Sequence, residues 1–104
     1  MEKVIIEESA NHYLNELIEI LFKDEYFGFM DSSIDYTNKI FDFIFSIPSQ
    51  VKKNTKNNKY GNYYCRFKIN TKTTWYIIFN LHQNTYLVTH ILNNHTADYP
   101  NLIL

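Results

Sequence analysis

Two stretches in the first half of the chain repeat apolar residues every three or four positions, the spacing of one buried face of an α-helix. Ser9 is placed to cap the first helix, a polar residue among positions 31–33 can cap the second, and Pro48 ends it. Two successive helices predict a helical hairpin with a tight connection over residues 23–30. The apolar positions are Ala10, Tyr13, Leu14, Leu17, Ile18 and Leu21 in the first helix, and Ile34, Thr37, Ile40, Phe41, Ile44 and Ile47 in the second.

The second half of the chain alternates apolar and polar residues with a period of two, which is the pattern of β-strands. The alternation predicts strands at residues 63–69, 73–81 and 85–92, and a β-branched run predicts one more at residues 3–6. Arg66 and Lys68 fall on the polar side of their strand. Trp75, Ile77 and Phe79 share one side of the next strand, which is apolar enough to be central and to pack under the helices.

The predicted order β-α-α-β-β-β defines an α+β fold with a single domain over residues 1–104. We expect an antiparallel sheet of about four strands, with the helical hairpin packed on one face and the other face partly open. Residues 50–62 are polar and predict an exposed, mobile loop, which we call the lysine loop. The tail at residues 93–104 is expected to be irregular, with residues 98–100 ordered near the sheet.

Charge divides the chain into two unlike halves, although the whole carries a net charge of only −1. Residues 1–46 hold ten acidic residues and three lysines, a net charge of −7, whereas residues 47–104 hold six lysines, one arginine and one aspartate, a net charge of +6. A basic surface of this kind most often binds phosphates or an acidic partner chain.

Several classes of protein are disfavoured by composition. A single cysteine, Cys65, forms no intramolecular disulfide and no cysteine-rich zinc site, and a protein of this kind suits the reducing cytoplasm. No apolar run reaches the roughly 20 residues of a membrane-spanning helix, and the N-terminal residues do not resemble a secretory signal. Only two glycines are present, so no glycine-rich phosphate loop is expected, and we predict neither a metal nor an organic cofactor.

The lysine loop and the strand after it place six cations within seventeen positions, interleaved with tyrosines. Cationic side chains bind backbone phosphates while aromatic rings stack on unpaired bases, which is the composition of a groove for single-stranded RNA. The alternative is a solvated loop that keeps the protein in solution. The residues concerned are Lys52, Lys53, Lys56, Lys59, Arg66 and Lys68, with Tyr60, Tyr63 and Tyr64.

Three histidines in the basic half are candidates for proton transfer near neutral pH. His82 falls at a turn and is expected to be exposed. Strand parity places His90 on the side of Tyr86, Val88 and Leu92, where a half-buried, hydrogen-bonded role is favoured over a catalytic one. His95 lies in the polar segment NNHTADY, and both a catalytic and a structural role remain open.

The order of elements, the lysine loop and the segments YYCRFKIN, TTWYIIFNLHQNTYLVTHIL and NNHTADY together resemble the RelE/ParE superfamily of bacterial toxins, the plasmid-stabilisation type. The resemblance implies the toxin of a type II toxin–antitoxin pair, with a cognate antitoxin as partner and messenger RNA cleaved at the ribosome without a metal. It implies that Arg66 and Lys68 hold the phosphate, that His95 transfers a proton, and that Tyr99 orients or donates. The RNA backbone and bases would be bound by Lys52, Lys53, Lys56, Lys59 and Tyr64.

The same resemblance leaves a second function open. Family members that cut RNA often carry an arginine in the central strand, where this chain reads Thr74-Trp75-Tyr76. The superfamily also includes toxins that bind DNA gyrase. The alternative is therefore a non-enzymatic module, either a gyrase-binding toxin or a degenerate protein that binds an antitoxin.

Overall fold

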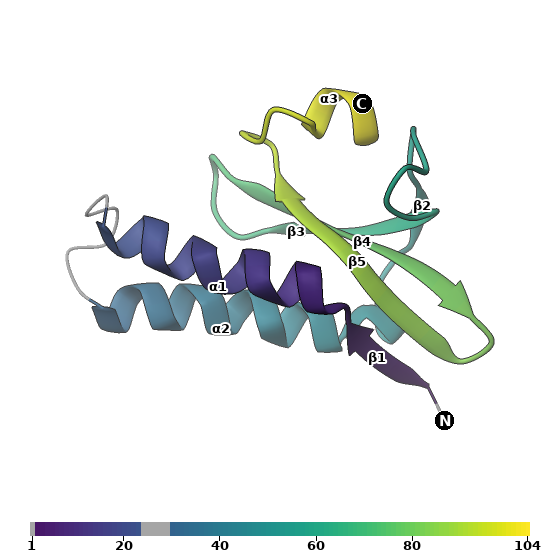
Figure 1. Ribbon diagram of the computed structural model, residues 1–104, viewed down its shortest axis with the longest axis horizontal. Helices are drawn as coiled ribbons and strands as arrows, with labels where there is room; N and C mark the ends of the chain where they lie inside the picture. Colours follow the sequence, from purple (N-terminus) through teal and green to yellow (C-terminus); the bar gives the residue numbers. More distant parts are fainter. Residues whose placement is uncertain (1, 24–29) are drawn as a thin grey trace.

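The computed structural model describes residues 2–23 and 30–104, and its helices and strands follow the predicted order with three additions (Figure 1). The additions are a 3-10 helix after the second helix, a two-residue strand inside the lysine loop and a short helix in the tail. The elements are β1 Lys3–Ile6, α1 Glu8–Lys23, α2 Met30–Phe45, the 3-10 helix η1 Ile47–Ser49, β2 Lys53–Asn54, β3 Tyr63–Lys68, β4 Thr74–His82, β5 Thr85–Asn93 and α3 Tyr99–Leu102.

The sheet is mixed and has five strands in the order β1-β5-β4-β3-β2. The α+β class is confirmed, but the prediction of an antiparallel sheet of about four strands is wrong in two respects. β1 pairs with β5 in parallel, and β2 adds to the edge of β3. After the helical hairpin the chain re-enters the sheet at the opposite edge, in β2 and β3. The antiparallel steps from β3 to β4 and from β4 to β5 then bring β5 back beside β1 in the same direction. At one end of this pairing the Lys3 amide donates a hydrogen bond to the Asn84 carbonyl, and at the other end the Glu7 amide donates one to the Val88 carbonyl.

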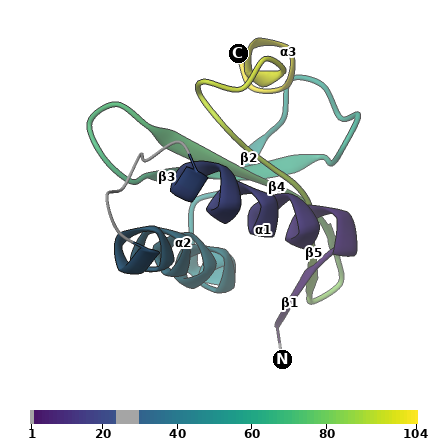
Figure 2. The ribbon, with the colours of Figure 1, turned by 60° about the vertical axis from the view of Figure 1, so that its left-hand side comes forward.

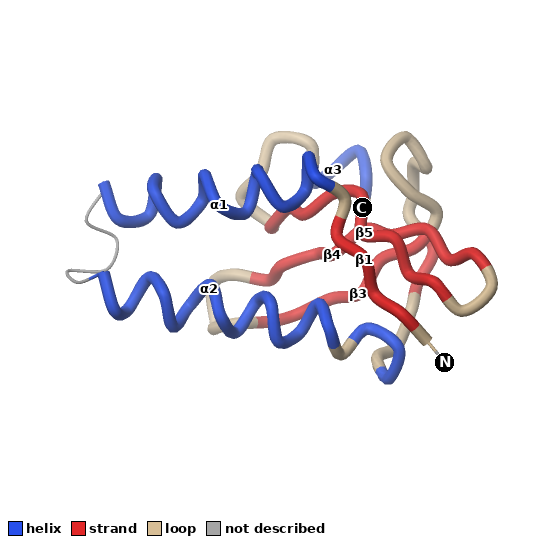
Figure 3. The backbone as a smooth tube through the Cα atoms, turned by 60° about the horizontal axis from the view of Figure 1, so that its bottom comes forward, coloured by secondary structure: helices blue, strands red, loops and turns tan. Residues whose placement is uncertain are grey.

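The helices α1 and α2 run side by side along one face of the sheet, which we call the inner face (Figures 2 and 3). Trp75, Ile77 and Phe79 are buried there, as predicted, and the Trp75 indole Nε1 donates a hydrogen bond of 2.9 Å to the Tyr36 hydroxyl of α2. The buried inner cluster consists of Ala10, Leu14, Ile40, Ile44, Ile47, Cys65, Trp75, Ile77, Phe79, Tyr86, Val88 and Ile91.

α3 lies over the opposite face of the sheet, which we call the outer face (Figure 2). A second apolar cluster lies beneath it. Leu102 of α3 is buried against Tyr76, Ile78 and Leu92. The tail is therefore ordered near the sheet, as expected for residues 98–100, but it is not irregular throughout. Its short helix forms because Leu102 supplies an apolar anchor and Pro100 lies in the first turn, where a missing amide proton costs nothing.

A β-bulge in the β4–β5 hairpin reverses the face of the sheet on which the side chains of the last part of β5 lie. Phe79 pairs with Val88 whereas Ile78 pairs with His90, so Thr89 is the extra residue. The predicted strand parity was therefore wrong for His90. Its side chain shares the outer face with Leu92 but not with the buried Tyr86 and Val88, which pack on the inner face. The bulge brings His90 to the tail segment that carries Asp98.

The helix boundaries differ from the predicted caps. α1 begins at Glu8, so Ser9 lies inside the first turn and its hydroxyl donates to the Glu7 carboxylate at 3.4 Å instead of capping the helix. α2 begins at Met30, which places residues 31–33 within the helix and not at its cap. α2 ends at Phe45, before Pro48, and Ile47, predicted as the last apolar position of this helix, lies with Pro48 in η1. Of the predicted connection 23–30, residues 24–29 lie outside the described residues.

Candidate nucleic-acid interface

The outer face carries a cluster of three tyrosines next to an exposed arginine. The Tyr76 ring lies 5.7 Å from the Tyr64 ring and 5.1 Å from the Tyr99 ring between centroids, and the Tyr76 hydroxyl donates to the Tyr99 hydroxyl at 3.3 Å. Arg66 is directly opposite Tyr76 in the β3–β4 pairing and is exposed. We call Tyr64, Tyr76 and Tyr99 the outer tyrosine cluster.

Cationic side chains form a row on the same face. Lys53 pairs with Tyr64 and Lys68 pairs with Thr74, and directly opposed residues in a sheet share a face. Lys53, Arg66 and Lys68 are all exposed. A hollow of about 410 Å³ lies between Lys53, Tyr64 and Arg66 and the segment at Gln50 and Val51. Three cations beside aromatic rings suit a polyanion that also carries planar groups.

Tyr76 is the member of this site that the sequence did not reveal. It is buried, and burial together with the hydrogen bond to Tyr99 raises the pKa of its hydroxyl to about 12, against the opposing effect of Arg66. At neutral pH Tyr76 is therefore a neutral hydrogen-bond donor and not a base. The alternation of residues along β4 does not indicate that Tyr76 belongs to the site, because only the pairing of β3 with β4 brings Tyr76 opposite Arg66.

His95, the predicted proton-transfer residue, lies at another point of the tail from Tyr99. Its side chain is exposed, and Nε2 is 3.2 Å from the Thr73 hydroxyl at the start of β4. Its backbone amide donates to the Asn93 side chain at 2.8 Å. The structure thus brings Arg66 and Tyr99 to the outer tyrosine cluster, while the His95 imidazole lies against Thr73 in the turn that precedes β4.

The four lysines of the lysine loop have different surroundings. The Lys52 ammonium donates to the Pro48 and Gln50 carbonyls at 3.1 and 2.8 Å and lies 5.4 Å from the Tyr86 ring centroid, so it binds its own chain. Lys53 faces the outer row described above. Lys56 and Lys59 are exposed and line an open pocket.

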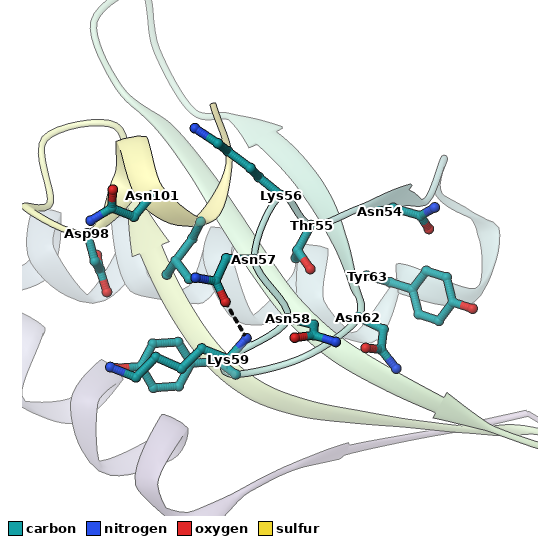
Figure 4. A pocket seen from close by; sticks show the side chains of 12 residues that line it. Asn54, Thr55, Lys56, Asn57, Asn58, Lys59, Asn62, Tyr63, Asp98 and Asn101 are labelled. Carbon is teal, nitrogen blue, oxygen red and sulfur yellow. Dashed lines mark hydrogen bonds between the residues drawn. The ribbon is translucent and has the colours of Figure 1, made fainter.

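That pocket, which we call the loop pocket, lies between the lysine loop and α3 and has a volume of about 930 Å³ (Figure 4). Asparagines and lysines of the loop line one side, and Asp98 and Asn101 line the other. The Lys56 amide donates to the Leu102 carbonyl at 2.9 Å, which ties the loop to α3. Within the pocket the Lys59 amide donates to Asn57 Oδ1 at 2.9 Å.

Metal and thiol chemistry find little support in the described side chains. Among the side chains that the structure describes, no three from histidine, cysteine, aspartate or glutamate gather closely enough to hold a metal ion. Cys65 is buried on the inner face, and burial raises the pKa of its thiol to about 11. The thiol is therefore protonated at neutral pH, which makes it a poor nucleophile.

No described helix combines the length and the apolar character needed to cross a bilayer. Comparison of the chain with protein-family models, with curated proteins and with solved structures finds no match. Function must therefore be inferred from the chemistry of the site itself.

The raised pKa of Tyr76 predicts a specific loss of stability in alkali. A tyrosine in an unfolded chain ionises near pH 10, whereas the folded protein holds the Tyr76 proton until about pH 12. The stabilisation is complete below pH 10 and is lost as the pH rises from 10 to 12, by on the order of 3 kcal/mol. Because pH 11 lies midway in this range, urea unfolding followed by Trp75 fluorescence at pH 8 and pH 11 measures roughly half of this change.

Tyr76→Phe removes the titrating hydroxyl and is expected to reduce the alkaline loss of stability without abolishing it, because burial also raises the pKa of the Cys65 thiol to about 11. Tyr64→Phe is the matched control, because it removes a hydroxyl from the same cluster but leaves the bond between Tyr76 and Tyr99. An alkaline loss in Tyr76→Phe as large as in the unmodified chain would show that Tyr76 is not responsible.

Proposed function

We propose that this chain is the toxin of a type II toxin–antitoxin pair and a metal-independent endoribonuclease that acts on messenger RNA at the ribosome. The observation that carries the proposal is Arg66, exposed on the outer face beside the outer tyrosine cluster and between two further cations. The predicted resemblance to the RelE/ParE superfamily supports the same assignment.

The proposed reaction is attack by a ribose 2′-oxygen on the adjacent phosphorus. A bond forms between the 2′-oxygen and phosphorus as the bond to the 5′-oxygen breaks, which leaves a 2′,3′-cyclic phosphate and a 5′-hydroxyl. One group must accept the 2′ proton, a cation must stabilise the charge on the phosphorane, and an acid must protonate the leaving oxygen. All of this can be supplied by side chains.

Arg66 is assigned to the phosphate, because a planar guanidinium binds two phosphate oxygens at once. Lys68 adds a second positive charge on the same face. Tyr99 accepts a hydrogen bond from Tyr76, so its own hydroxyl proton is available to a phosphate or leaving oxygen. His95 is the proposed proton acceptor, which requires the bound RNA to reach the turn at Thr73.

The antitoxin is proposed to cover the basic surface of the second half of the chain. Residues 47–104 carry a net charge of +6, and the row Lys53, Arg66 and Lys68 is exposed. A partner segment with acidic and apolar residues would match this charge and neutralise the phosphate-binding row. Binding of the antitoxin and of RNA would then exclude one another.

A non-enzymatic module that binds gyrase or an antitoxin is the second candidate. It is favoured by the position of His95, whose recorded side-chain bond is with Thr73 and not with the Arg66 and Tyr99 region. It is also favoured by the neutral state of Tyr76, which supplies no base. A surface that holds RNA or protein without cutting needs only the cations and the rings.

A cell-free translation extract separates the two functions. The purified chain is expected to stop translation and to cleave the message, leaving 2′,3′-cyclic phosphate ends. Translation that stops with intact message would contradict the nuclease assignment and favour the binding module. A parallel supercoiling assay with purified gyrase then tests whether gyrase is the target.

A further inference from the structure

Three rings and a cation form a continuous stack that leads from α1 to the loop pocket. The Tyr13 and His90 rings lie 6.2 Å apart between centroids, and the His90 and Tyr60 rings lie 4.1 Å apart with their planes within 15°. The Lys59 ammonium lies over the Tyr60 ring at 5.3 Å from its centroid. We call Tyr13, His90 and Tyr60 the ring stack.

The inner end of the ring stack is fixed by the fold. The β-bulge at Thr89 turns His90 toward the tail, where Nε2 lies 3.1 Å from Asp98 Oδ2. Tyr13 belongs to α1, which begins at Glu8, just after the pairing of β1 with β5 ends at Val88. The His90 ring is therefore held between a helix and the loop and cannot rotate without breaking its bond to Asp98.

The loop that carries Tyr60 is pinned at the residue after it. Gly61 is buried, and a Cβ there would lie 2.8 Å from Ile78 Cγ2 and 3.1 Å from the Phe79 carbonyl oxygen, so only glycine allows this close approach. The Thr55 hydroxyl donates to the Gly61 carbonyl at 2.8 Å, and the Asn62 amide donates to Asn80 Oδ1 at 2.9 Å. These contacts hold the Tyr60 ring in place before any ligand binds.

The outer end of the stack can be exchanged. Lys59 is exposed and its ammonium covers the Tyr60 face by a cation–π contact, which at an exposed site is worth only about 0.5–1 kcal/mol. A planar base covers more of the Tyr60 ring face than the Lys59 ammonium does. Once displaced, the Lys59 ammonium would lie beside the base, where the phosphate of a nucleotide is found.

We infer that the loop pocket is a nucleotide subsite for single-stranded RNA, in which one unpaired base stacks on Tyr60 in the place of the Lys59 ammonium while Lys56 and Lys59 hold the flanking phosphates. The asparagines of the lysine loop, together with Asn101 of α3, supply side-chain amide donors and acceptors for base edges. The choice of RNA as ligand rests on the proposed function. Neither Arg66 nor any member of the outer tyrosine cluster lines this pocket, so the subsite would bind RNA and not cut it.

Binding of uncleavable RNA tests the subsite. Fluorescence anisotropy is measured with a labelled 2′-O-methyl oligonucleotide of about ten units and with an abasic chain of the same length, neither of which permits attack by a 2′-oxygen. Tyr60→Leu is expected to bind the base-bearing chain roughly 5- to 150-fold more weakly, the effect of losing one stacked base, and to bind the abasic chain unchanged. Lys59→Gln should weaken both chains alike and reduce the salt dependence.

Phe45→Leu is the matched control, because Phe45 is an exposed aromatic residue of α2 that does not line the loop pocket. Tyr60→Phe keeps the ring and is expected to bind as tightly as the unmodified chain, while circular dichroism checks that each variant folds. Equal effects of Tyr60→Leu on both oligonucleotides, or an equally large loss from Phe45→Leu, would overturn the subsite. Binding that depends on Tyr60 without any cleaved message would sustain the subsite and overturn only the nuclease, whereas no binding at all would overturn both.

Discussion

Arg66→Ala is expected to reduce RNA cleavage by roughly 10²–10³-fold, the effect of removing one preorganised electrostatic donor from a transition state. The side chain is exposed on the outer face, so its loss removes little packing and the domain should stay folded. Cleavage is measured on a short RNA at fixed salt, with growth inhibition in cells as a second readout and circular dichroism as the test of folding.

The size of the effect separates a catalytic role from simple attraction of RNA. Lys53→Ala removes another exposed cation of the same row and is expected to weaken RNA binding and its salt dependence, with a much smaller loss of rate at saturating RNA. Arg66→Lys keeps the charge but not the planar fork and should recover only part of the activity.

His95→Gln extends the test to proton transfer and is expected to lower the cleavage rate as Arg66→Ala does. If both variants keep full toxicity while folded, the nuclease proposal fails, and the gyrase-binding or antitoxin-binding module becomes the better account. Loss of activity in Arg66→Ala alone would retain the phosphate site and require another proton acceptor.

The periodicity of the sequence was sufficient to place the helices and strands because their buried faces are continuous. β1 was predicted with its observed bounds, and Trp75, Ile77 and Phe79 are buried where their alternation placed them. Strand direction was not accessible in the same way, since a parallel and an antiparallel partner bury the same residues. The pairing of β1 with β5 depends on the path of the helical hairpin, and no local pattern encodes that path.

The sequence predicted those parts of the candidate site that lie within one β-strand, and not those that depend on how strands pair. Arg66 and Lys68 were predicted on one polar side from alternation alone, and the register confirms that they share the outer face. The ring stack was not predicted, because it requires the bulge at Thr89 to reverse the parity of β5 and to turn His90 toward Tyr60. A bulge adds one residue without any distinctive residue type, so strict alternation assigned His90 to the side of Tyr86 and Val88.

The core prediction with the largest effect concerns Trp75, which is 1% exposed and holds the helices on the sheet. Trp75→Ala is expected to lower the free energy of unfolding by about 3–5 kcal/mol, because it removes the largest buried side chain and leaves a cavity beneath α2. It also removes the hydrogen bond to the Tyr36 hydroxyl. Since Trp75 is the single tryptophan, urea unfolding is followed by far-ultraviolet circular dichroism.

Two variants show whether this loss comes from the buried ring. Trp75→Phe keeps an aromatic ring in the inner cluster and is expected to be destabilised less than Trp75→Ala. Phe45→Ala is the matched surface control, because Phe45 lies on α2 with 58% of its surface exposed and should change the free energy of unfolding by no more than about 0.5 kcal/mol. A loss in Phe45→Ala equal to that in Trp75→Ala would mean that α2 does not pack on the sheet through Trp75. In that event the inner face would be arranged differently, and the outer face, with Arg66 opposite Tyr76, would have to be reassigned with it.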